Sequence, residues 1–78
     1  MSIQTVENNV RVKTLFKEKK YREAIKFLSK KIKSEPNNHS LFALRARAFQ
    51  QLSNHKRAAE DFNQASILNK ESTKYKRD

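Results

Sequence analysis

The chain lacks cysteine and glycine altogether and contains one proline, Pro36, among its 78 residues. Without cysteine it has no disulfides and no thiolate metal ligands. Strands and sharp turns usually draw on glycine and proline, so their scarcity favours helix along nearly the whole chain. The longest apolar run, Leu41 to Leu44, is far too short to span a bilayer. We therefore expect a single small all-α domain over residues 1–78, with no membrane among its partners.

Acidic residues are also scarce, since eight Asp and Glu stand against eighteen Lys and Arg, for a formal net charge of +10. The excess is concentrated between Arg11 and Lys33, where ten basic residues accompany only two glutamates. Such a surface favours acidic partners, either protein or nucleic acid. The N-terminal segment lacks the basic stretch and apolar stretch of a secretory signal. We expect a cytoplasmic protein, with the nucleus as the alternative location.

Apolar residues recur every three or four positions, a spacing that predicts helices over residues 6–19, 22–33, 39–52 and 56–68. Pro36 ends the second helix, because the residue before a proline is pushed out of helical geometry. Asn37 or Asn38 caps the third helix. Phe62 is expected in the core, where its truncation to alanine costs about 3–5 kcal/mol. Residues 71–78 form either a cap, the start of a fifth helix or a frayed tail.

The chain matches itself under a 34-residue shift, so that Arg11 falls on Arg45 and Ala24 on Ala58. A period of this length in a helical pattern is typical of stacked helix–turn–helix units. The positions that define the pattern are Leu15, Tyr21, Ala24, Ile25, Leu28 and Pro36 in the first unit, and Arg45, Ala46, Phe49, Ala58, Phe62 and Ala65 in the second. With these residues at these positions the chain resembles the tetratricopeptide repeat family, more closely in the second unit than in the first.

The resemblance implies two stacked antiparallel helical hairpins, a fragment of an α-solenoid, with repeats at about 5–36 and 39–70. The sequence departs from the family pattern at its second glycine position, which is Lys19 in one repeat and Ser53 in the other. Lys70 also replaces the closing proline of the second repeat. Because two repeats are fewer than the three that normally bury a continuous core, the open C-terminal end is expected to be capped, to self-associate or to continue into a longer array.

The resemblance also implies a binding surface, because the first helix of each hairpin in this family lines a concave groove for an extended peptide. The corresponding residues here are Asn9, Lys13, Phe16, Lys17, Ala43, Arg47, Gln50 and Arg77. A basic groove suits an acidic segment or a chain-terminal carboxylate. The expected function is a non-enzymatic adaptor or scaffold, similar to a co-chaperone.

The alternative is a basic helical module that binds RNA or DNA phosphates. Its contact residues would be Lys19, Lys20, Arg22, Lys26, Lys30 and Lys33. Tyr21 and Phe27 lie nearest this surface and are candidates for stacking on unpaired bases. Catalysis is not expected, because His39 and His55 lie at the entries of two different helices and a glycine-rich phosphate loop is impossible without glycine. The sequence predicts no catalytic residue, no metal site and no cofactor.

Overall fold

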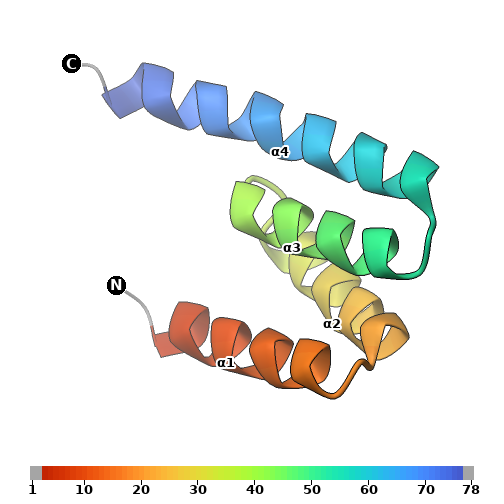
Figure 1. Cartoon of the computed structure of the whole chain (residues 1–78). Helices are drawn as coiled ribbons and strands as arrows, with labels where there is room; N and C mark the ends of the chain where they lie inside the picture. Colours follow the sequence, from red (N-terminus) through yellow and green to blue (C-terminus); the bar gives the residue numbers. More distant parts are fainter. Residues whose placement is uncertain (1–2, 77–78) are drawn as a thin grey trace.

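The protein is an all-α fold, as the composition predicts. The computed structural model describes the backbone of residues 3–76 and the side chains of residues 10–70. Four helices follow one another along the chain, and α3 lies between α2 and α4 (Figure 1). Their bounds are α1 Ile3–Lys17, α2 Tyr21–Ser34, α3 His39–Gln51 and α4 His55–Lys76. None of the described helices is long and apolar enough to cross a membrane.

The link between α2 and α3 is ordered by local chemistry. The helix α2 ends at Ser34, two residues before Pro36, as the restriction on the residue before proline requires. Of the two predicted caps, Asn38 is the one that acts, because its side-chain oxygen accepts a hydrogen bond from the Ser40 amide at 3.1 Å. Its side-chain nitrogen also donates to Glu35 Oε1 at 3.2 Å. These contacts fix the short connection between the hairpins.

The two hairpin turns have the same backbone structure at equivalent positions of the internal repeat. Lys19 and Ser53 both adopt the left-handed conformation, with φ of 60° and 61°. After each of them, the amide of the next residue returns to the last turn of the preceding helix, Lys20 N to Leu15 O at 2.8 Å and Asn54 N to Phe49 O at 2.9 Å. This pairing is the Schellman motif. The internal repeat in the sequence is therefore a repeat in the structure.

The main core cluster joins the first three helices. Val12 of α1, Leu28 of α2 and Leu41 of α3 are each at most 3% exposed and pack together. Four partly buried residues surround them, namely Phe16, Phe27, Ile32 and Leu44. Small side chains permit close helix contact elsewhere, since Ala24, Ala46, Ala48 and Ala58 are all nearly or fully buried.

The structure corrects two predictions about α4. Phe62 is 37% exposed, although the sequence pattern placed it in the core. Under the 34-residue shift Phe62 occupies the position of Leu28, which α3 helps to bury. Among the described residues no further helix follows α4 to cover Phe62 in the same way. In the first hairpin α3 packs over the equivalent residue Leu28, and no described helix packs over Phe62 in that way.

The second correction concerns the end of α4. This helix continues to Lys76, so no turn separates residues 71–76 from the fourth helix to make a fifth one. Lys70 stands where the first hairpin has Pro36, and lysine leaves the helix free to continue. Nearby, Leu68 is 7% exposed and Ile67 is 44% exposed, so Leu68 is the residue that packs inward.

Candidate functional site

The helix α3 and the exposed ring of Phe62 form an open hollow of about 420 Å³. The residues that line it are His39, Ser40, Ala43, Leu44, Arg47 and Phe62. Ala43 and Arg47 are one turn apart on α3 and belong to the groove that the sequence predicted. The hollow combines an exposed aromatic ring, small or aliphatic side chains and one exposed guanidinium group. This combination suits a partner with an apolar face and a carboxylate.

The remaining predicted groove residues are spread along α1 and the end of α3. Lys13 and Lys17 are exposed on α1, and Gln50 is exposed one turn beyond Arg47 on α3. None of the three lines the hollow. Asn9 lies in α1, but its side chain is outside the described part of the structure, and Arg77 is outside the described residues altogether. Of the predicted set, the hollow thus brings together Ala43 and Arg47.

Phe16 is a packing residue of the first hairpin. It contacts the core cluster, and its ring meets the ring of Tyr21 edge to face, with centroids 5.5 Å apart. The ring is only partly exposed, because it packs against Tyr21 at the start of α2. This contact ties the end of α1 to the start of α2 across the turn at Lys19 and Lys20.

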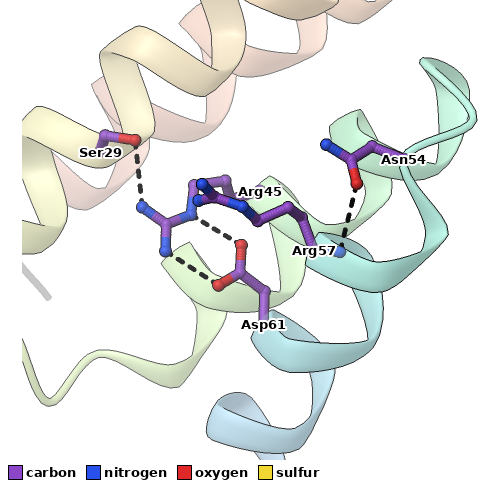
Figure 2. Close-up of polar contacts among 5 residues, drawn as sticks. All are labelled: Ser29, Arg45, Asn54, Arg57 and Asp61. Atoms are coloured by element: carbon purple, nitrogen blue, oxygen red, sulfur yellow. Dashed lines mark hydrogen bonds and ion pairs between the residues drawn. The ribbon is translucent and has the colours of Figure 1, made fainter.

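An ion pair joins α3 to α4, and a hydrogen bond from the same arginine joins α3 to α2 (Figure 2). Arg45 Nε donates to Asp61 Oδ2 at 2.7 Å, and Arg45 Nη2 donates to Asp61 Oδ1 at 2.8 Å. The remaining guanidinium nitrogen, Nη1, donates to Ser29 Oγ at 3.0 Å. Asp61 is only 6% exposed, so the carboxylate is buried with its partner. The two-point geometry orients α3 more rigidly than a single hydrogen bond would.

From the sequence alone, the adjacent acidic residues Glu60 and Asp61 are expected to form a surface pair, and this expectation is wrong for Asp61, which is buried. A signal for its burial was present, because Asp61 lies in phase with the inward-facing Ala58, Ala65 and Leu68. A carboxylate in such a stripe needs a buried partner. Arg45 lies in the same relation to Leu41 and Ala48 on α3.

The first hairpin uses the equivalent positions differently. Arg11 corresponds to Arg45 and Phe27 to Asp61, and the Arg11 guanidinium lies 5.4 Å from the centroid of the Phe27 ring. The ammonium group of Lys31 lies 5.7 Å from the same centroid. Both are cation–π contacts. Around them is an open hollow of about 300 Å³, lined by Arg11, Leu15, Glu23, Lys26, Phe27 and Lys30.

Exposed cations run along the outer face of α2. Arg22, Lys26, Lys30 and Lys33 follow one another at intervals of four, four and three residues, and all four are exposed. This spacing keeps them on one side of the helix, over roughly 16 Å of its length. Lys19 and Lys20 stand just before the helix, where Lys20 forms an exposed ion pair with Glu18 at 3.4 Å. The four α2 residues of the nucleic-acid alternative therefore make one basic ridge.

Tyr21 and Phe27 contribute little free aromatic surface to this ridge. The Phe27 ring makes cation–π contacts with Arg11 and Lys31 and packs against the core cluster. The Tyr21 ring contacts Phe16. Within the described residues, no group of three or more histidine and carboxylate side chains is placed to hold a metal ion.

No family model, curated protein or solved structure matches this chain.

Proposed function

We propose that this protein is a non-enzymatic docking module, an adaptor or scaffold that binds an acidic protein segment on the hollow between α3 and α4. The observation that carries the proposal is the pairing of Arg47 with Phe62 in one open hollow of about 420 Å³. An exposed ring gives affinity through apolar burial, and an exposed guanidinium selects a carboxylate. The net charge of +10 would attract an acidic segment before contact is made.

We also propose that the two hairpins are repeats of the tetratricopeptide kind. The helix ends support this proposal, because α1 and α3 end at equivalent positions of the 34-residue shift, Lys17 and Gln51. The helices α2 and α4 likewise begin at an equivalent pair, Tyr21 and His55. If the hairpins are such repeats, α3 is the first helix of the second repeat, and the hollow lies on the side of the stack that α3 forms. The exposed cations of α1 would then extend the binding surface beyond the hollow.

The test is an amide-resolved NMR titration of the labelled chain with a short peptide rich in Glu and Asp and ending in a free carboxylate. We expect saturable shifts at Ala43, Arg47 and Phe62. Reversing the charge in Arg47→Glu should weaken binding by about three- to tenfold. The matched control is Arg57→Glu, because Arg57 is exposed on α4 and does not line the hollow. Equal weakening by both variants would mean that only net charge matters, and the proposed site would be wrong.

The second candidate function is nucleic-acid binding, which the basic ridge of α2 favours. Four aligned cations can neutralise successive phosphates without reading bases. A single-stranded RNA should then shift residues 19–33, and its affinity should fall steeply as salt rises. A double variant, Lys26→Glu with Lys30→Glu, should abolish this binding while it leaves the response of Arg47 to the acidic peptide intact. Loss of RNA binding at physiological salt in the unaltered chain would remove this candidate.

A further inference from the structure

The first hairpin shows how a helix seats on this repeat. The helix α3 lies over Leu28 of α2, which is fully buried, and contributes Leu41 and Leu44 to the same cluster. One turn along, Arg45 reaches Ser29 on α2 with a hydrogen bond of 3.0 Å. The helix α3 therefore packs on the first hairpin through Leu41 and Leu44, three positions apart, and through the adjacent hydrogen bond of Arg45.

Within residues 3–76, no helix covers the equivalent surface of the second hairpin in this way. Phe62 takes the place of Leu28 under the 34-residue shift, and the exposure of this position changes from full burial to 37%. The residues of α3 that line the hollow correspond in the same way to α1 residues 5, 6, 9, 10 and 13. Among the described elements, α4 continues straight to Lys76 rather than turning back over Phe62.

We propose that an acidic amphipathic helix of a partner protein occupies this hollow and covers Phe62 as α3 covers Leu28. The proposal rests on the docking function above and specifies its partner. The partner helix presents apolar side chains at i, i+3 and i+7, the spacing of Leu41, Leu44 and Ala48 in α3. A Glu or Asp on its flank meets Arg47 at the edge of the hollow.

Charge selects a foreign acidic helix over a second copy of this chain. The element of a second copy that matches the position of α3 is α1, whose exposed residues include Arg11, Lys13 and Lys17. Placing these cations beside Arg47, between two molecules of net charge +10 each, is unfavourable at ordinary salt. An acidic helix gains from the same field, so the exposed ring and the positive field favour the same occupant.

The experiment uses two synthetic peptides of equal length and charge. The first peptide carries leucine at positions i, i+3 and i+7, with glutamate and a few alanines on its remaining faces. The second peptide is identical except that a central proline replaces one of the alanines. Binding to the whole chain is measured by fluorescence anisotropy, and peptide helicity by circular dichroism of the mixture. We expect the helical peptide to gain helicity and to bind at least about tenfold more tightly than the proline peptide.

Two variants locate the contact. Phe62→Ala should lower the affinity for the helical peptide by about tenfold or more, since it removes the central aromatic contact. Ile67→Ala is the matched control, because Ile67 is an exposed apolar residue of α4 outside the hollow. Both truncations remove exposed side chains, and circular dichroism of each free variant verifies that it is folded.

The outcomes separate this inference from the function on which it rests. Equal binding of both peptides, sensitive to Arg47→Glu and insensitive to Phe62→Ala, overturns the helical partner and retains an acidic docking site. Failure of both peptides, in the titration as in this assay, overturns the docking function as well. Concentration-dependent self-association that Phe62→Ala abolishes would show that a second copy occupies the hollow, and it too overturns the inference.

Discussion

Removing the carboxylate of Asp61 should destabilise the fold by about 2–3 kcal/mol. Breaking a buried pair by deleting one partner typically costs about 3–5 kcal/mol, because a buried charge is left uncompensated. Here the Arg45 side chain is 21% exposed and keeps its hydrogen bond to Ser29, so water and Ser29 recover part of the loss. A chain of this size has a total stability of about 4–12 kcal/mol, so the loss is a large fraction of it.

The assay is urea unfolding followed by circular dichroism, applied to Asp61→Ala, Arg45→Ala and the double variant. We expect a coupling energy of about 1.5–3 kcal/mol between the two positions, because they share two charge-assisted hydrogen bonds. In a thermal melt, Asp61→Ala should lower the midpoint by about 10–20 °C. Glu60→Ala is the control, since Glu60 is the exposed neighbour of Asp61 and should change stability by less than about 0.5 kcal/mol.

A coupling energy below about 0.5 kcal/mol would refute the reasoning, because the pair would then contribute no more than an exposed ion pair. A changed urea dependence in one variant would indicate a different unfolded or native state, and the cycle would be repeated with Asp61→Asn. Asparagine keeps the shape of the side chain and one acceptor, so it should cost less than alanine. A more destabilising asparagine would contradict the role of the carboxylate geometry.

The remaining predictions concern the turns and the two equivalent apolar positions. Lys19→Gly and Ser53→Gly should each raise stability by about 0.5–1 kcal/mol in urea unfolding, because glycine takes a φ near 60° without the clash that a Cβ causes, an advantage only partly offset by its freer unfolded chain. A loss of stability in both would show that the turns are not left-handed in solution. Leu28→Ala should cost about 2–5 kcal/mol in the same assay, whereas Phe62→Ala should cost about 1 kcal/mol. Equal costs would place Phe62 in a buried site and contradict the open hollow.

The apolar periodicity predicted where the helices lie. Most of their ends could be predicted as well, because helix ends depend on nearby residues. Pro36 and the cap at Asn38 act within a few residues, and the turns at Lys19 and Ser53 follow from the 34-residue spacing. The first helix was predicted to begin at Val6, but α1 begins at Ile3. Ile3 lies three positions before Val6, so the apolar spacing does extend to the observed start of α1.

The exposure of Phe62 could not be predicted from the apolar pattern, and the pattern marked Asp61 only as lying on an inward face, because burial also depends on which helix lies opposite. Phe62 has the phase of a buried residue, yet it is 37% exposed and borders an open hollow together with residues of α3. Asp61 has the same kind of phase and is buried, because α3 supplies Arg45 as its partner. Periodicity identifies the face of a helix, and only the tertiary arrangement identifies its neighbour.

One pair of equivalent positions contributes a single charge to the difference between the two hairpins, because Phe27 stands where the second hairpin has Asp61. In the second hairpin the arginine meets the carboxylate of Asp61, and its charge is neutralised inside the fold. In the first hairpin the equivalent arginine, Arg11, lies on the ring of Phe27, which attracts the cation but carries no net charge. Lys31 adds a second cation over the same ring, and Glu23 is the one acidic side chain among the residues that line the hollow beside it. An aromatic residue at position 27, where the repeat has a carboxylate at 61, therefore holds two cations in place and leaves their charge available to the surface of α2.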